Sequence, residues 1–389
     1  MHRPIAVLLL SLTCVTAAHA ATDAAWRQSM SPADLARFDR LTAEVEDHYD
    51  TTRGGYVEKG GMPNEAAISL ALTMGNDGQG ARWTSHALGT LDWMRQLADS
   101  TGGGYYDHHP DTEGPAALID KTTAAHARRM EAQLDAWQVT GDEIYHKNAA
   151  WIADFASRVL LDARGGFVVG QTGDRDPFPV PNGLMIHAWL RWAVANADPR
   201  TRDFAYKSID RVWSHAWVDE SGLVEFGTFG EPLTHPQLLD QVEMGRALVL
   251  ASRVGGRPQD RQRAVQIGDL LLSQFEDTGR GGFRSQVVHA HDGNVKKGSR
   301  DLLENARAVL FLYELARLTG DTRYHAAADR AVAAFDDQFD KLKLDAAEWA
   351  LAIRAGSVDD LPAAPAWHAV AEDVKPESER THVYHTKKR

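Results

Sequence analysis

Cysteine is almost absent from this chain. Of the 389 residues only Cys14 is a cysteine, and it lies within an apolar N-terminal stretch. Once that stretch is removed the chain has no thiol, so it forms no disulfide bond and supplies no thiolate to a metal ion. The stretch itself, "IAVLLLSLTCVTAA", is too short to span a bilayer. We therefore expect neither a disulfide scaffold nor a membrane span.

Positive charge is also in short supply. There are 42 Lys and Arg residues against 54 Asp and Glu residues, which gives a formal net charge of −12. Binding to a phosphate backbone depends on counterions released by basic side chains, so this balance argues against nucleic acid as a partner. No H-x-x-x-H or comparable ligand spacing stands out. We expect no metal, no cofactor, and a carbohydrate or another small neutral molecule as substrate, and we leave the oligomeric state open.

The first twenty residues have the three parts of a secretory signal. "MHRP" is a short basic start, the apolar stretch follows it, and "AHA" at residues 18–20 is a small-x-small cleavage site. A lipid anchor on Cys14 is the alternative, but Thr13 stands where such anchors usually have a small residue. We therefore expect residues 1–20 to be a signal peptide and the protein to be periplasmic or secreted.

Helical hairpins repeat along the rest of the chain. "TGDEIYHKNAAWIADF" from residue 140 and "TGDTRYHAAADRAVAAF" from residue 319 each follow an apolar-periodic run, so each Thr-Gly-Asp marks a turn between two helices. Five pairs begin at intervals of about sixty residues, near Asn64, Lys121, Asn182, Gln241 and Glu304. The unpaired first and last helices make a sixth pair, which closes a ring. The sequence predicts an all-α fold, an (α/α)6 barrel over residues 21–360, followed by a polar tail (361–389) of disordered composition.

A pair of glycines followed by Tyr or Phe precedes several of the expected inner helices. In a ring of hairpins such connections gather at one mouth, which would bring together Tyr56, Tyr105, Tyr106 and Phe283. Aromatic rings at that position either plug the end of the barrel or stack on sugar rings. We name the four as candidate substrate-binding residues, with both roles open.

Three segments carry a resemblance to a known family. They are "DKTTAAHARRMEAQLDAWQVTGD" (120–142), "PNGLMIHAWLRWA" (181–193) and "DLLENARAVLFLYELARLTGDTRYHAAADRAVAAF" (301–335). These segments resemble the helical part of the spermatogenesis-associated-protein-20-like family, whose members carry a thioredoxin-like domain followed by a six-hairpin glycosidase-like barrel. The resemblance implies that barrel for this chain. A more distant resemblance is to the N-acylglucosamine 2-epimerases.

The sequence departs from the family at one site. Asp120 and Lys121 match an acidic residue and a lysine that open an inner helix in the family, whereas Ala125 and His126 replace an Asp-Asn pair. A catalytic role inherited from that pair is therefore not expected here. Redox chemistry is not expected either, because the thioredoxin-like part is missing from this sequence.

Glycoside hydrolysis needs two carboxyl groups beside one bond, one to protonate the leaving oxygen and one to activate water or to attack. The loop "GGGYYDHHPDTEG" combines aromatic rings, imidazoles and carboxylates just before the helix opened by Asp120 and Lys121. We expect Asp107 or Glu113 to approach Asp120 across a pocket, with Lys121 keeping one carboxylate ionised. The leading hypothesis is a glycosidase-like hydrolase acting on a glycan.

Two other functions stay open. A sugar epimerase would use histidines as acid and base, and His126 and His187 are candidates on inner helices. A non-catalytic barrel would bind a saccharide or a protein through the same mouth. Asn182 and Asn305 begin inner helices in equivalent repeats, so each either caps its helix or offers its amide to a polar ligand.

The signal peptide leads to a direct prediction. Protein recovered from the exported fraction should begin at Ala21, because cleavage follows the "AHA" triplet. Intact-mass spectrometry of that protein checks this. A mass that includes residues 1–20, or an acyl group on Cys14, would contradict it.

Overall fold

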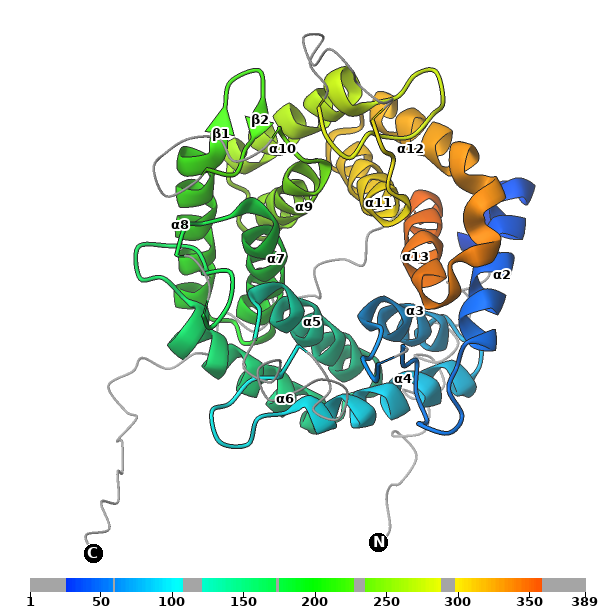
Figure 1. The fold of residues 1–389 in the computed structure, drawn as a ribbon, viewed down its shortest axis with the longest axis vertical. Helices are drawn as coiled ribbons and strands as arrows, with labels where there is room; N and C mark the ends of the chain where they lie inside the picture. Colours follow the sequence, from blue (N-terminus) through cyan, green and yellow to red (C-terminus); the bar gives the residue numbers. More distant parts are fainter. Residues whose placement is uncertain are drawn as a thin grey trace, which may run out of the picture.

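Twelve long helices form two concentric rings in the part of the chain that the structure describes (Figure 1). The structure is a computed structural model, and it describes residues 26–58, 60–107, 121–172, 175–226, 235–287 and 298–358. The expected signal peptide, the expected tail, Glu113 and Asp120 lie outside these ranges.

The two rings alternate along the chain. The inner ring consists of α3 (Glu65–Asn76), α5 (Thr123–Thr140), α7 (Pro179–Ala195), α9 (Leu238–Gly255), α11 (Leu302–Thr319) and α13 (Ala346–Ser357). The outer ring consists of α2 (Pro32–Asp47), α4 (Ala81–Met94), α6 (Glu143–Phe155), α8 (Pro199–Ala216), α10 (Pro258–Leu270) and α12 (Thr322–Phe335). Helix α13 packs against α11, α3 and α2, so the last helix closes the ring (Figure 1). The predicted (α/α)6 barrel is confirmed.

Short irregular segments extend some of these helices. Single π-helical turns end two outer helices, at Ala156–Leu160 and Leu271–Phe275, and 3-10 turns occupy Arg95–Leu97, Asp336–Lys341 and Lys343–Asp345. Among the described residues the sheet is limited to β1 (Trp217–Val218) paired antiparallel with β2 (Gly222–Leu223). No described helix is long and apolar enough to cross a membrane.

Each Thr-Gly-Asp turn joins an inner helix to the next outer helix. Gly141 and Gly320 adopt left-handed backbone conformations, with φ of 68° and 78°, and end α5 and α11. Asp142 and Asp321 then cap α6 and α12, because each side chain accepts a hydrogen bond from a backbone amide of the new helix. The repeated sequence therefore encodes one helix stop and one helix start.

The connections from outer to inner helices share another local design. In four of them an Asp side chain accepts a hydrogen bond from the backbone amide two residues later: Asp50, Asp99, Asp162 and Asp277. A glycine pair at positive φ follows three of these aspartates, at residues 103–104, 165–166 and 281–282. These pairs turn the chain back so that the next residue bridges the end of the outer helix, as Tyr105 does with Ala98.

A buried polar side chain on the following inner helix holds four of the connections, which include the turns at Asp99, Asp162 and Asp277. The Asn182 amide accepts a hydrogen bond from the Phe167 amide at 2.7 Å and donates to the carbonyls of Phe167 and Phe178, both at 2.9 Å. The same arrangement recurs four residues after the N-cap of three further inner helices, and we call this set the connection clamps: His126, Asn182, Gln241 and Asn305. The clamps satisfy backbone groups that would otherwise be buried without partners.

The residue after Asn182 brings two inner helices into backbone contact. A Cβ atom built on Gly183 would lie 2.5 Å from the carbonyl carbon of Glu243, so only glycine fits at this crossing of α7 and α9. The segment "NGLMI" therefore combines a clamp, a helix crossing and three buried apolar side chains. This crossing sets the position of Glu243 beside the centre of the barrel.

Replacing Asn182 with Ala should lower the free energy of unfolding by about 2–4 kcal/mol, because the buried amide and carbonyl of Phe167 both lose their partner. Urea denaturation followed by circular dichroism measures this. Asn196→Ala is the matched control, since Asn196 is exposed at the end of α7. It should change stability by less than about 1 kcal/mol, and equal losses in the two variants would refute the role of the clamp.

Candidate functional site

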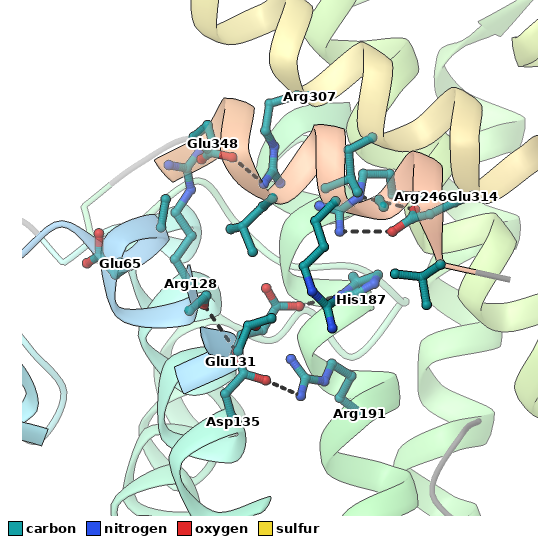
Figure 2. Close-up of a pocket in the computed structure, with 18 of the residues that line it drawn as sticks. Glu65, Arg128, Glu131, Asp135, His187, Arg191, Arg246, Arg307, Glu314 and Glu348 are labelled. Carbon is teal, nitrogen blue, oxygen red and sulfur yellow. Dashed lines mark hydrogen bonds and ion pairs between the residues drawn. The ribbon is translucent and has the colours of Figure 1, made fainter. Parts of the chain in front are cut away.

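A cavity of about 280 Å³ lies along the axis of the inner ring. Its walls come from α3, α5, α7, α9, α11 and α13, and Figure 2 shows their side chains converging on it. Most of the lining is charged: Glu65, Arg128, Glu131, Asp135, His187, Arg191, Arg246, Arg307, Glu314, Arg317, Glu348 and Arg354. No Tyr, Trp or Phe is among the described lining residues. We call this space the axial cavity.

Arg307 on α11 joins two neighbouring helices through its guanidinium group. It donates to both carboxylate oxygens of Glu243 at 2.8 Å and to Glu348 at 3.3 Å. Burial raises the pKa of the Glu243 carboxyl, but Arg307 and Arg246 outweigh that effect and hold the pKa below its ordinary value. Glu243 is therefore ionised and fully paired.

Two further ion pairs cross the cavity wall. Arg191 on α7 donates to Asp135 on α5 at 2.6 Å, and Ser69 donates to the other oxygen of the same carboxylate at 3.1 Å. Arg246 on α9 lies 3.3 Å from Glu314 on α11. Each pair joins adjacent inner helices, so the charges fix the ring in register as well as compensating one another.

His187 on α7 is paired with Glu131 on α5 (Figure 2). The Nδ1 atom of His187 lies against a Glu131 oxygen, and both side chains are mostly buried, at 17% and 20% exposure. Burial raises the pKa of Glu131, but His187, Arg191 and Arg246 outweigh it and lower that pKa to about 2. Glu131 accepts the Nδ1 proton, and the other ring nitrogen, Nε2, has no hydrogen-bond partner among the described residues. This pair is the group in the axial cavity best suited to move a proton.

Among the described residues that were proposed from sequence, His187 is the one that lines the axial cavity. Tyr56, Tyr105 and Phe283 are at most 2% exposed and pack in the core between the rings. Tyr106 is partly exposed beside Lys121, whose ammonium lies 4.8 Å from the centre of its ring. The structure thus separates the aromatic residues from the charged cavity instead of gathering both at one place.

Lys121 is buried and occupied by other partners. Its ammonium donates to Asp99 at 2.6 Å and to the carbonyl of Gly103 at 2.7 Å. This hydrogen bond from Lys121 holds the pKa of Asp99 well below its ordinary range. Asp107 accepts a hydrogen bond from the Thr122 amide at 2.9 Å, so it lies at the start of α5. Its expected approach to Asp120, like the role of Glu113, lies outside the described residues and stays a prediction.

The three remaining candidates are connection clamps. His126, Asn182 and Asn305 are fully buried and bind backbone groups of the preceding turn. The two asparagines therefore neither cap their own helices nor reach the axial cavity. Burial, with help from the charge of Arg129, lowers the pKa of His126 to about 3.

Sequence reasoning missed most of the axial cavity. Glu131, Glu243, Arg246 and Arg307 lie on inner helices whose other residues are largely buried and apolar. The signal that could have found them is the spacing of isolated charges within apolar runs, as in "VEMGRALVL" and "NARAVLFLYEL". Among the described residues no group of three or more His, Cys, Asp or Glu is arranged to hold a metal ion.

The two rings and the axial cavity define a barrel of the six-hairpin glycosidase type. The chain is 26% identical to human spermatogenesis-associated protein 20 over 145 residues, which cover 36% of this chain and 18% of that protein. The resemblance seen in the sequence is thus confirmed as a weak similarity, and the chain spans about a fifth of the length of the curated relatives it matches. No protein-family model matches the sequence.

Solved structures share the whole fold. A D-mannose isomerase superposes with a TM-score of 0.63 at 16% identity, over 79% of this chain and 86% of that chain. A family 76 glycoside hydrolase, an α-mannanase from Bacteroides thetaiotaomicron, gives a TM-score of 0.65 at 10% identity, over 83% of this chain and 95% of that chain. At these identities the likeness shows the fold alone.

His126 should make the barrel sensitive to acid. Its pKa is about 3 in the folded chain, while an exposed histidine titrates near 6.5, so below about pH 6.5 the unfolded chain binds a proton that the folded chain excludes. The stability contributed by the neutral ring is present above about pH 6.5 and is lost as the pH falls towards 3, by about 1.4 kcal/mol per unit.

The variant His126→Asn tests this, because asparagine holds the equivalent turns before α7 and α11 without titrating. Its free energy of unfolding should fall less steeply between about pH 6 and pH 4 than that of the parent. His325→Asn, at an exposed position on α12, serves as control and should follow the parent. Parallel curves for the parent and His126→Asn would contradict the assignment.

Proposed function

We propose that this chain is a carbohydrate-active enzyme that moves a proton at the carbon beside a sugar carbonyl, as aldose–ketose isomerases and 2-epimerases do. The observation that carries the proposal is the pairing of His187 with ionised Glu131 in the axial cavity. The shared fold with a D-mannose isomerase supports it. Export, as expected from residues 1–20, would place this activity in the periplasm or outside the cell.

The first step follows from the tautomer of His187. With Nδ1–H held by Glu131, Nε2 accepts the proton from carbon 2 of an open-chain aldose. The electron pair of that C–H bond forms the C1–C2 double bond, and the negative charge moves to the oxygen on carbon 1 of an enediolate. Guanidinium groups such as Arg246 and Arg307 supply positive charge in a confined space of low dielectric, which stabilises that anion.

The second step returns the proton. Delivery to carbon 1, with transfer of the hydroxyl proton from the oxygen on carbon 2 to the oxygen on carbon 1, yields the ketose. Delivery to the opposite face of carbon 2 yields the epimer instead. Both products require the same proton abstraction, so His187 and Glu131 carry that step for either outcome, and Glu131 acts as the positioning residue because it holds the ring in the active tautomer.

Hydrolysis finds less support in the axial cavity. A glycosidase needs one carboxyl group that keeps its proton until the leaving oxygen takes it. Glu131 and Glu243 have lowered pKa values, and Asp135, Glu314 and Glu348 each lie against an arginine. A hydrolase would therefore depend on Asp107 together with Glu113 and Asp120 rather than on these carboxylates.

The experiment compares the parent with His187→Asn on mannose, glucose, fructose, N-acetylglucosamine, cellobiose and glucuronate in D2O. The parent should convert at least one sugar to its isomer or epimer and incorporate deuterium, at carbon 1 of a ketose product or at carbon 2 of an epimer or an aldose product, as detected by NMR. His187→Asn should lower kcat by about a hundredfold to ten-thousandfold, because it removes the base. His325→Asn, at the exposed outer position, is the matched control and should keep the parental rate.

Three outcomes would overturn the proposal. One is full activity in His187→Asn. Another is cleavage of oligosaccharides by the parent that survives in His187→Asn and is lost in Asp107→Asn, which would establish the hydrolase. The third is saccharide binding without turnover of any sugar offered, which would establish the non-catalytic barrel.

A further inference from the structure

Arg128 differs from the other arginines of the axial cavity in its partners. Arg191, Arg246 and Arg307 each bind a carboxylate on a neighbouring helix. The remaining two are also engaged, Arg354 with Asp77 and Arg317 with the carbonyls of Ala355 and Val358. Arg128 is exposed on the cavity wall and makes no hydrogen bond or ion pair with any described residue. Its guanidinium group is therefore open to direct contact with a bound molecule.

Arg128 lies near Glu131, which is paired with His187. Arg128 precedes Glu131 by three residues on α5, so the two side chains are neighbours on one helix face, with about 5–6 Å between Cβ atoms. The positive charge of Arg128 also helps to lower the pKa of Glu243 on α9, which shows that it acts across the cavity. In Figure 2, Arg128 and Glu131 both come from the helix that faces His187. Arg128 is therefore one helical turn along α5 from Glu131, the partner of His187.

We propose that Arg128 binds the carboxylate of the substrate, and that the substrate is a sugar acid such as a hexuronate. This inference rests on the proposed function, because it places the carboxylate at one end of the sugar and the carbon that His187 deprotonates near the other. The spacing along α5 is comparable with the length of a six-carbon chain from carbon 2 to a terminal carboxylate. The net charge of −12 belongs to the whole chain and does not decide binding at one arginine of the cavity wall.

A carboxylate fits this wall better than a phosphate. The planar guanidinium group matches a carboxylate in a two-bond, fork-like geometry and balances its single negative charge. A phosphate ester carries nearly two charges and binds where several donors or a helix N-terminus converge. Arg128 is in the second turn of α5, away from the helix N-terminus, and the other arginines of the cavity are occupied.

Isothermal titration calorimetry of the full chain tests the inference. The probes are glucuronate, galacturonate and mannuronate, their neutral counterparts glucose, galactose and mannose, and glucose 6-phosphate. At least one uronate should bind the parent roughly tenfold or more tightly than its neutral counterpart. Arg128→Gln should remove that preference, Arg128→Lys should retain part of it, and Arg95→Gln, an exposed substitution in the outer layer, should behave as the parent.

The outcomes separate this inference from the proposed function. Uronate binding that persists in His187→Asn but falls in Arg128→Gln supports the carboxylate site even if no isomerase activity exists. Uronates that bind no more tightly than neutral sugars, a preference unchanged in Arg128→Gln, or selective binding of glucose 6-phosphate would each overturn the inference while leaving proton transfer on neutral sugars intact.

Discussion

The whole barrel depends on satisfying backbone groups that are buried where the two rings meet. At that junction a turn connects each outer helix to the next inner helix. The backbone amides and carbonyls of this turn are buried away from water. The connection clamps supply partners for these groups from inside the next helix. Because one side chain binds both the turn and its own helix, it also fixes how far the inner helix projects towards the axis. The charged walls of the axial cavity are positioned by these contacts.

The architecture could be predicted from the sequence because the same short local signals recur in each helical hairpin. Apolar periodicity, Thr-Gly-Asp stops and glycine pairs recur at a constant interval, and each is decided by a few neighbouring residues. The clamps could not be predicted in this way. His126 and Asn182 occupy the same structural position with different chemistry, and their partners are backbone groups about 15 to 21 residues away. Sequence alone showed polar residues in a first or second helical turn, where capping is the usual reason.

The axial cavity was hidden for a related reason. Inner helices are surrounded on nearly all sides, so their apolar residues mark no single buried face, and the face towards the axis cannot be found from periodicity. Glu131 and His187 are 56 residues apart and meet only because α5 and α7 are adjacent in the closed ring. Their pairing therefore depends on the closed ring, which determines which inner helices are neighbours. Desolvating so many charges is tolerable because nearly every one has an opposite charge on the next helix, which makes the cavity walls interdependent.

The closing pair of helices is divided between the two ends of the chain. Helix α2 packs on α13, the Ser29 hydroxyl donates to the Ser357 carbonyl at 2.6 Å, and Arg37 reaches Asp336. The ring therefore closes late in synthesis, because the contacts between α2 and α13 cannot form until α13 has left the ribosome. Until then the flanks of α3 and α11 that α13 will cover are exposed to solvent. A chain that stops a few dozen residues early would be an open crescent with two apolar edges, which other unfinished chains could cover by joining edge to edge.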